Sequence, residues 1–292
     1  MFSAEWLALR EPVDSAARSA ALTRALADVL HPHLPLRALD LAAGTGANAR
    51  YVADHVSGAQ EWLLIDHDPA LLSHVAPRMS IWAFARGREI SKEGLLTVRG
   101  QGFECSFDRR QADLRTLDDP AIFSGRTLVA ASALLDLVSG PWMQALAARC
   151  RAADAAALFA LTYDGRMSCS PAEAEDERIR ALVNAHQRTD KGFGPALGPD
   201  AVDAAAAHFA DVGYQIRREP SDWVLDSGSH ELQRQLIDGW AKAAIAVAPS
   251  EATSVVSWRA RRLEHVEHDR SELVVGHEDL AAWLAFTNLV IG

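Results

Sequence analysis

A glycine-containing turn is the part of this sequence whose residue types and spacing could most directly do chemistry. It reads Asp40-Leu41-Ala42-Ala43-Gly44-Thr45-Gly46 and ends an apolar run that begins at Leu36. Gly44 and Gly46 let the backbone turn sharply beside a ligand, and a helix after the turn offers free amide groups at its N-terminus. Asp66 ends the next apolar run, where a carboxylate can bind both hydroxyls of a ribose. Together these residues predict an adenosine site.

Two classes of adenosine cofactor are compatible with this turn. The segment Gly44-Thr45-Gly46-Ala47-Asn48-Ala49 satisfies the dinucleotide pattern G-x-G-x-x-G/A, and Asp66 does not discriminate because both classes carry a ribose. Asp40 separates them, because it stands between Leu39 and Leu41 in a predicted buried strand, where a carboxylate is costly unless something binds it. A dinucleotide site places no acid there, whereas the methionine end of S-adenosylmethionine carries an ammonium group. The position of Asp40 therefore favours S-adenosylmethionine.

The turn and three later segments resemble the motifs of the class I S-adenosylmethionine-dependent methyltransferases. Their first motif is an acid followed by three alternating glycines, and Ala42 stands here in place of the first of these. Leu63-Leu64-Ile65-Asp66 is similar to the second motif, Gln111-Ala112-Asp113-Leu114 to the third and Ser132-Ala133-Leu134-Leu135 to the fourth. The resemblance covers residues 14–163 and implies that Asp113 meets the adenine amino group. The cofactor site it implies consists of Asp40, Ala42, Gly44, Thr45, Gly46, Asn48, Asp66, His67, Asp113, Leu114 and Ser132.

A polar segment at 185–194 is the candidate for the acceptor side of the site. It follows the fifth predicted strand, and ligands of open α/β sheets bind outside the carboxyl ends of the strands. We expect it to line an acceptor pocket, and a solvated surface loop is the alternative. The predicted catalytic residues are His186, Asp164 and Tyr163, with His186 or Asp164 as the general base. The predicted substrate-binding residues are Arg188, Asp190 and Phe193.

Other charged and metal-binding residue types give weaker signals. Arg10 and Arg18 lie in or near the first predicted helix and could reach the carboxylate of the cofactor. His265 and His268 have the i, i+3 spacing of a metal pair, but their charged neighbours are typical of an exposed helix end. We therefore expect no metal.

The elements that must position these residues alternate between apolar strands and amphipathic helices up to residue 163. Asp14 is predicted to cap the first helix. That first helix is predicted to run from its cap at Asp14 to about residue 30, and further helices are predicted at 47–56, 68–89 and 142–150. Strands are predicted at 36–41, 61–66, 127–132 and 156–163, with a hairpin at 95–99 and 104–108. This alternation predicts an α/β fold. With the resemblance, we expect a Rossmann-like, doubly wound, mostly parallel seven-stranded sheet with helices on both faces.

The alternation breaks after Tyr163, where a polar stretch precedes further helices. Helices are predicted at 201–211, 230–247 and 250–266, and strands at 214–218 and 272–275. We interpret residues 1–292 as a single domain with a cofactor-binding core at 14–163. Residues 166–200 and 229–268 are predicted to be helical cap insertions over the substrate.

The composition of the chain restricts the classes of binding partner and the cellular compartment that we expect. The chain of 292 residues has 29 Lys and Arg against 39 Asp and Glu, a formal charge of −10 that disfavours nucleic acid as a partner. Its three cysteines show no C-x-x-C spacing, which suits a reducing compartment. Glu5 stands where a signal peptide needs basic residues, and no apolar run would span a bilayer. We expect a cytoplasmic monomer or homodimer that does not bind membranes.

The sequence as a whole predicts S-adenosylmethionine-dependent methyl transfer to a small-molecule acceptor. Since the sulfonium already activates the methyl group, the protein must chiefly align acceptor and methyl and exclude water. An NAD(P)-dependent oxidoreductase of Rossmann type would keep the fold and bind a nicotinamide cofactor. A non-catalytic S-adenosylmethionine-binding protein would bind without turnover, and both alternatives remain open at this point.

Overall fold

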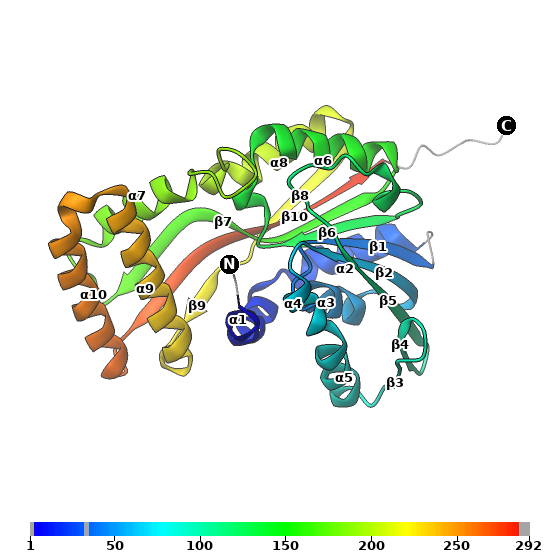
Figure 1. Cartoon of the computed structure of the whole chain (residues 1–292), viewed down its shortest axis with the longest axis horizontal. Coiled ribbons are helices and arrows are strands. Elements are labelled where there is room, and N and C mark those ends of the chain that lie inside the picture. The colour runs from blue at the N-terminus through cyan, green and yellow to red at the C-terminus, as the bar shows by residue number, and fades with distance from the viewer. Residues whose placement is uncertain (1–2, 32–34, 286–292) are drawn as a thin grey trace.

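The computed structural model describes residues 3–31 and 35–285, and Figure 1 shows how their helices and strands are arranged. The helices are α1 (Ala4–Ala17), α2 (Ala20–Leu30), α3 (Ala47–His55), α4 (Pro69–Ser73), α5 (Val75–Ala85), α6 (Gly140–Ala152), α7 (Asp176–Gln187), α8 (Ala201–Asp211), α9 (His230–Val247) and α10 (Ala252–Glu267). The strands are β1 (Leu36–Leu41), β2 (Gly58–Asp66), β3 (Glu89–Ser91), β4 (Leu96–Gly100), β5 (Phe103–Gln111), β6 (Leu128–Ser132), β7 (Ala156–Ser170), β8 (Tyr214–Pro220), β9 (Trp223–Leu225) and β10 (Glu272–Leu284).

The described strands form one sheet in the order β3-β4-β5-β2-β1-β6-β7-β10-β8, with β9 paired to β10. Strands β5, β2, β1, β6 and β7 are parallel, while β10 runs antiparallel to both β7 and β8. The doubly wound, mostly parallel α/β sheet is confirmed. The sheet has ten described strands and not the predicted seven, because β3 and β4 extend one edge and β9 pairs with β10.

Helices cover both faces of this sheet because its central strands are apolar on both sides. In β1, Leu39 and Leu41 belong to one hydrophobic cluster, whereas Leu36 and Ala38 belong to another on the opposite face. Residues of α6 and α8 complete the first cluster, and residues of α2, α3 and α5 complete the second. The two layers fix the carboxyl ends of β1, β2, β5 and β6 at one edge, where the predicted site residues follow the strands.

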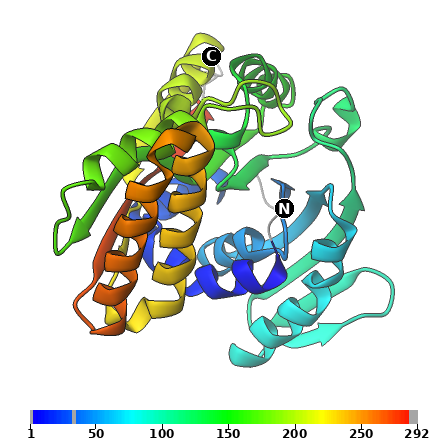
Figure 2. The same ribbon diagram turned by 60° about the vertical axis from the view of Figure 1, so that its left-hand side comes forward.

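Two strands continue beyond the core and carry a second lobe, which we call the cap lobe. Strand β7 continues to Ser170, and β10 begins at Glu272, so residues 166–170 continue a strand where an insertion was predicted. Helices α7, α9 and α10 pack around these extensions, and Figure 2 shows α9 and α10 side by side. Both predicted insertions, 166–200 and 229–268, contribute to this lobe. Their assignment as substrate caps stays a prediction.

Several predicted helix boundaries were wrong for identifiable reasons. Asp14 lies inside α1 and binds Arg10, while Ser19 caps α2 by accepting a hydrogen bond from the backbone of Leu22. The helix predicted at 68–89 is divided into α4 and α5. Pro77 falls in the first turn of α5, where proline is tolerated, whereas inside one continuous helix it would clash with the preceding turn.

None of the helices within residues 3–31 and 35–285 is long and apolar enough to cross a membrane.

Candidate functional site

The glycine turn joins β1 to α3 through backbone that only glycine adopts freely. Gly44 and Gly46 have φ values of 54° and 80°, and the Gly46 amide donates to the carbonyl oxygen of Ala43 at 2.8 Å. Ala42 also lies in the left-handed region, at a φ of 53°. Ala42 therefore occupies a conformation that glycine would adopt without strain, at the position where the resembled motif has glycine.

Asp40 lies at the end of β1 with its side chain enclosed. It is 0% exposed, and its Oδ1 accepts a hydrogen bond from Nδ2 of Asn48 at 2.6 Å. Its Oδ2 has no hydrogen-bond partner among the described residues. Burial raises the pKa of Asp40 to about 7, although the Asn48 hydrogen bond and the charge of Arg18 act in the opposite direction. A buried carboxylate oxygen without a donor can accept one from a ligand.

Arg18 stands on the other side of Asn48, between α1 and α2. Its Nη1 donates to Oδ1 of Asn48 at 2.7 Å, and its guanidinium carbon lies 3.9 Å from the centroid of the Tyr51 ring. The residue is 6% exposed, and Nε and Nη2 have no partner among the described residues. Burial lowers the pKa of Arg18, and nearby acids, chiefly Asp279, act against this. Arg18 thus binds Asn48 directly, and its reach to the carboxylate of the cofactor stays a prediction.

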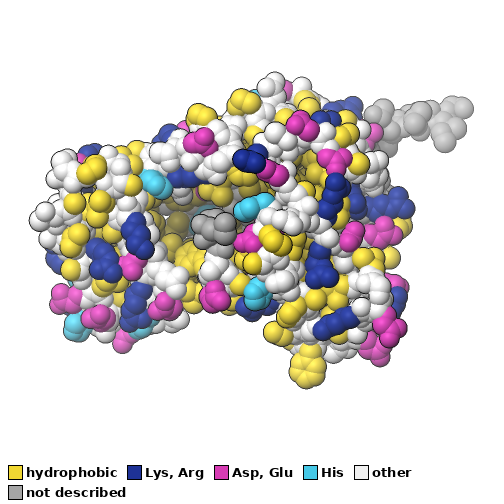
Figure 3. All heavy atoms as spheres, viewed as in Figure 1, with side chains coloured by type: hydrophobic (Ala, Val, Ile, Leu, Met, Phe, Trp, Pro, Cys, Tyr) yellow, Lys and Arg dark blue, Asp and Glu magenta, His cyan; other side chains and the backbone are white. Residues whose placement is uncertain are grey.

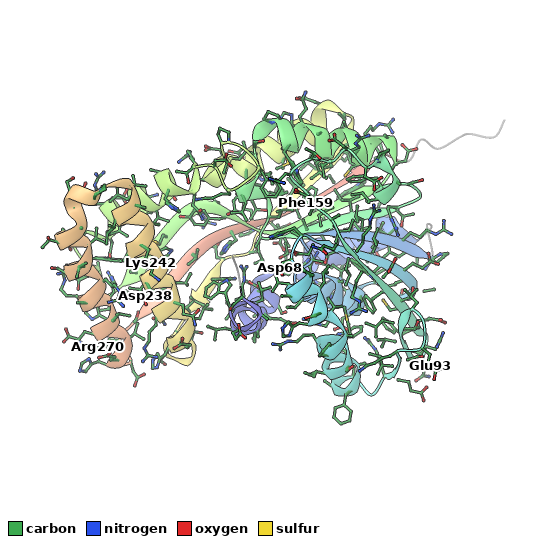
Figure 4. All side chains as sticks on the ribbon, in the orientation of Figure 1. Asp68, Glu93, Phe159, Asp238, Lys242 and Arg270 are labelled. Atoms are coloured by element: carbon green, nitrogen blue, oxygen red, sulfur yellow. The ribbon has the colours of Figure 1, made fainter. Side chains whose placement is uncertain are left out.

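Asp66 links the glycine turn to the end of β2. Its Oδ2 accepts from the Gly44 amide at 2.8 Å, and its Oδ1 accepts from the Asp68 amide at 2.9 Å. His67 is exposed, with Nδ1 at 3.2 Å from Oδ1 of Asp66. Asp68 caps α4 and is labelled in Figure 4, where it marks this edge of the sheet. Asp66 therefore lies beside the turn, and its role as a ribose ligand stays a prediction.

The residues similar to the third and fourth motifs follow β5 and β6 at the same edge. Asp113 is exposed and pairs with Arg115, whose Nε donates to Oδ2 at 2.7 Å. Leu114 is buried, and its carbonyl oxygen accepts from the Trp142 indole at 2.6 Å. Ser132 is half-buried at the end of β6. Their positions suit a cofactor that crosses these strand ends, and their contacts to adenine stay predictions.

Helix α1 lies against the glycine turn, although the first helix was predicted to begin only at Asp14. Leu7 Cδ1 lies 3.0 Å from where a Cβ on Gly44 would be. Glu11 accepts from Nη2 of Arg50 at 2.6 Å, and Nη1 of Arg50 donates to the backbone carbonyl of Thr45 at 2.7 Å. Helix α1 therefore packs directly against the turn and against Arg50 of α3.

On the acceptor side, Tyr163 and Asp164 end the core part of β7 and have different surroundings. The Tyr163 hydroxyl donates to Oδ1 of Asn184 at 2.7 Å, and burial raises its pKa. Asp164 accepts from the backbone amide and Nε of Arg166, at 2.8 and 2.7 Å, and Arg166 also binds Asp222. Asp164 is thus committed to an ion-pair network, and its role as a base stays a prediction.

His186 and Arg188 lie at the C-terminal end of α7 and contact different side chains. Lys191 Nζ lies 3.3 Å from Nδ1 of His186, and burial together with that cation lowers the pKa of His186. Arg188 pairs with Asp200 at 2.9 Å on the surface. His186 is therefore a neutral imidazole at neutral pH, as a general base must be. The catalytic role of His186 and the binding role of Arg188 stay predictions.

Asp190 and Phe193 shape the loop that follows α7. Oδ1 of Asp190 accepts from the amides of Gly192 and Gly194, at 2.6 and 3.0 Å. The Phe193 ring meets the Trp142 ring edge to face, with centroids 5.8 Å apart. These contacts hold the loop against the start of α6, and substrate binding by either residue stays a prediction.

Asp136 is a candidate site residue that the sequence interpretation missed. It lies in a single 3-10 turn (Leu135–Leu137) directly after β6, is 7% exposed, and accepts no hydrogen bond from another described side chain. Burial raises its pKa to about 6, whereas the charges of Arg10 and Lys191 lower it. The sequence contains a signal for this residue, because Asp136 is the one acidic residue in the apolar run 133–138.

His277 of β10 was also missed, because its strand was predicted to end at Val275. Its buried ring lies 6.2 Å from the ring of Tyr163 and 5.0 Å from that of Trp223, measured between centroids. Burial lowers its pKa to about 3, so it is neutral. Figure 3 shows a hollow between the core and the cap lobe with hydrophobic side chains in its walls.

The histidines that had the spacing of a metal pair lie in the cap lobe. There the His265 side chain pairs with Glu173, and no group of three metal-ligand residues occurs in the described part of the chain.

Known proteins resemble this chain in structure and not in sequence. No protein-family model and no curated protein matches it. A precorrin-6y C5,15-methyltransferase from Geobacter metallireducens GS-15 is 9% identical, covers 91% of this chain and 86% of its own, and gives a TM-score of 0.43. An S-adenosylmethionine-dependent methyltransferase from Geobacter sulfurreducens, in complex with S-adenosylhomocysteine, is 14% identical, covers 92% of both chains and gives 0.41.

A third solved structure, the cyclopropane synthase MmaA2 from Mycobacterium tuberculosis, is 12% identical. The structural alignment covers 88% of this chain and 83% of the synthase chain, with a TM-score of 0.41. Because identities and scores are this low, we draw the function from the geometry of the site.

Proposed function

We propose that this protein binds S-adenosylmethionine and transfers its methyl group to a small-molecule acceptor. One observation carries the proposal: Asp40, next to the glycine turn, is fully buried, and one of its carboxylate oxygens has no donor among the described residues. A buried charged oxygen is costly unless a partner binds it, and an ammonium group is a matching partner. The glycine turn and Asp66 are in direct contact through the hydrogen bond from the Gly44 amide, so one adenosine ligand could reach both.

A nicotinamide dinucleotide fits these residues less well. Its pyrophosphate is anionic and would lie at the N-terminus of α3, close to the buried Asp40, so both negative charges would share one low-dielectric region. It would also leave Oδ2 of Asp40 without a donor. The chemistry of this donor set therefore supports a cofactor with a cationic end.

The cofactor, when bound, supplies a methyl group already activated by its sulfonium, so this chain has to orient the acceptor and keep water out. Tyr163 lies where the core part of β7 ends, His186 lies on α7, and Asp136 lies beyond the adjacent end of β6. We assign the acceptor to the space between these elements. Asp136 is the best placed to take a proton from an acceptor hydroxyl or amine, because Asp164 is held by Arg166. The charge of −10 favours a small acceptor over a nucleic acid.

Binding is tested by titration calorimetry with S-adenosylhomocysteine and, separately, with NADH. We expect heat of binding with S-adenosylhomocysteine alone, and binding of NADH alone would overturn the proposal. Turnover is tested by incubating the protein with methyl-labelled S-adenosylmethionine and a small-molecule metabolite extract, then measuring labelled products by mass spectrometry. Asp136→Asn should lower labelling by about 100-fold or more with unchanged S-adenosylhomocysteine affinity. Binding without any labelling would indicate the non-catalytic alternative.

A further inference from the structure

Helix α5 is apolar on the side that faces solvent as well as on the side that faces the core. Its buried residues belong to a hydrophobic cluster of the core and are Val75, Met79, Trp82 and Ala83. Four further apolar residues are exposed at the spacing i, i+4, i+7, i+8, which places them on one side of a helix: Pro77, Ile81, Phe84 and Ala85. We call these four residues the outer stripe.

The outer stripe holds the two most exposed large hydrophobic side chains of the described residues. Phe84 is 86% exposed and Ile81 is 64% exposed, and they are neighbours because they are three residues apart on one helix. Figure 3 shows hydrophobic side chains projecting from the molecule where α5 lies in Figure 1. Single exposed apolar residues are ordinary, whereas a group of them on one helix face marks a contact surface.

The charge around the outer stripe is opposite in sign to that of the whole chain. Residues 69–88 contain three arginines and no acidic residue, although the chain carries a formal charge of −10. Arg78 has no ion-pair partner among the described residues, while Arg86 and Arg88 share Asp54, at 2.6 and 2.8 Å. Because salt screens exposed charges beyond about 8 Å, a surface touching α5 experiences mainly these arginines. The stripe therefore favours an anionic partner.

The shape and charge of this surface favour a lipid bilayer over a protein. Packing against a second copy would bring together the three arginines of each chain, which repel one another. One helix of eleven residues also offers much less than the roughly 800 Å² per partner of a stable protein interface. A bilayer requires no matching groove, because apolar side chains enter the acyl boundary while neighbouring arginines meet the headgroup phosphates.

We propose that the outer stripe docks α5 on an anionic lipid surface, with Ile81 and Phe84 inserted and Arg78 and Arg86 at the headgroups. The total charge of the chain led to the opposite expectation, since it averages over surfaces that this contact does not include. On the inner side of α5, Met79 Cε lies 3.1 Å from where a Cβ on Gly46 would be. The docked helix is thus the one that packs on the glycine turn. The proposal is independent of the proposed function.

The test is co-sedimentation of the protein with vesicles of phosphatidylcholine alone or of equal parts phosphatidylcholine and phosphatidylglycerol. We expect binding to the anionic vesicles to be at least about 10-fold tighter, and to weaken as salt is raised. The double variant Ile81→Ser with Phe84→Ser should bind at least about 30-fold more weakly, because it removes the inserted side chains. Arg78→Gln should bind about 5-fold more weakly.

The matched control is Val224→Ser with Val256→Ser, which removes two side chains that are 61% and 54% exposed on β9 and α10. This control should bind vesicles as the wild type does. Phe84→Ser alone serves if circular dichroism shows that the double variant does not fold. No binding to anionic vesicles, or equal binding by the wild type and the stripe variant, would overturn the proposal. A lipid-free dimer in analytical ultracentrifugation that the stripe variant abolishes would also overturn it, since a second copy would then cover the stripe.

Discussion

The core and the cap lobe each bury an arginine, and the two arginines differ in how their nitrogen atoms are used. Arg262 of α10 is 0% exposed, donates to the carbonyl of Pro171 at 2.5 Å and binds both carboxylate oxygens of Asp176. Asp176 also accepts from the Trp258 indole at 2.8 Å. Within residues 3–31 and 35–285, Arg18 of the core makes one side-chain hydrogen bond, and two of its nitrogen atoms have no partner.

Under the proposed function, this difference separates side chains that stabilise the fold from side chains that bind the cofactor. The network around Arg262 is complete within the chain, so it can only stabilise the packing of α7 against α10. The network around Arg18 and Asp40 is incomplete within the described residues, and such a group is kept at a cost to stability. Burial alone therefore does not distinguish these two arginines, whereas the hydrogen bonds of their nitrogen atoms do.

The largest effect is expected from breaking the complete network. Arg262→Met removes the cation that pairs with Asp176, and loss of one partner of a largely buried pair should lower the free energy of unfolding by about 3 kcal/mol. Urea unfolding measures this, and S-adenosylhomocysteine affinity should be unchanged in the folded protein. Arg259→Met is the surface control, because Arg259 pairs with the half-exposed Asp238 of α9, labelled in Figure 4. That variant should lose less than about 1 kcal/mol, and equal losses would contradict the comparison.

The second prediction removes a charge from the incomplete network. Asp40→Asn keeps the shape of the side chain and abolishes its attraction for an ammonium group, so S-adenosylhomocysteine affinity should fall by about 10-fold to 100-fold. The unliganded variant should unfold at the same or a higher temperature than the wild type, because a buried unpaired charge is removed. Calorimetric titration and thermal unfolding measure the two effects. A variant that loses stability and keeps its affinity would show that Asp40 serves the fold.

The third prediction concerns pH. Burial raises the folded-state pKa of Asp40 to about 7, so below that pH the carboxyl is protonated and binding of an ammonium requires release of the proton. S-adenosylhomocysteine affinity should therefore fall by up to about 10-fold per pH unit below pH 7, and Asp40→Asn should lack this dependence.

The same pKa fixes the sign of the stability effect. Between the ordinary carboxyl pKa near 4 and the folded-state value, the unfolded chain is ionised at this residue and the folded chain is not, so Asp40 makes unliganded stability fall as pH rises. Urea unfolding of wild type and Asp40→Asn from about pH 4.5 to pH 7.5 should give curves whose difference changes in that direction. An opposite slope would mean that Asp40 is ionised and stabilised within the folded chain.

Local patterns predicted much of the core. Strand β1, helix α8 and helix α9 have the predicted bounds, and the glycine turn and Asp66 come together as their spacing indicated. These features depend on apolar periodicity and on one crossover between neighbouring strands, both of which are encoded within a few dozen residues.

The remaining features depend on contacts between distant parts of the chain. The extension of β7 becomes a strand because β10 pairs with it, more than a hundred residues later. Helix α1 contains Pro12 in its interior, which argues against a helix, and its contacts with the glycine turn and the cap lobe overcome that preference. Arg18 meets Asn48 across 30 residues of sequence, so this contact could not be derived from spacing.

The smallest effect is expected at Ala42, where the turn itself is strained. A φ of 53° costs a non-glycine residue about 1 kcal/mol, so Ala42→Gly should raise the free energy of unfolding by up to about that amount. Ala43 is adjacent and buried and has no positive φ, so Ala43→Gly should lower stability by a similar amount through the greater backbone entropy of the unfolded chain. Urea unfolding of the two variants should therefore show changes in the free energy of unfolding with opposite signs, although both variants replace an alanine by glycine. If both glycines destabilise the protein, the conformation at Ala42 differs from the one described, and the incomplete network around Asp40 would have to be reconsidered, since the turn determines where that carboxylate points.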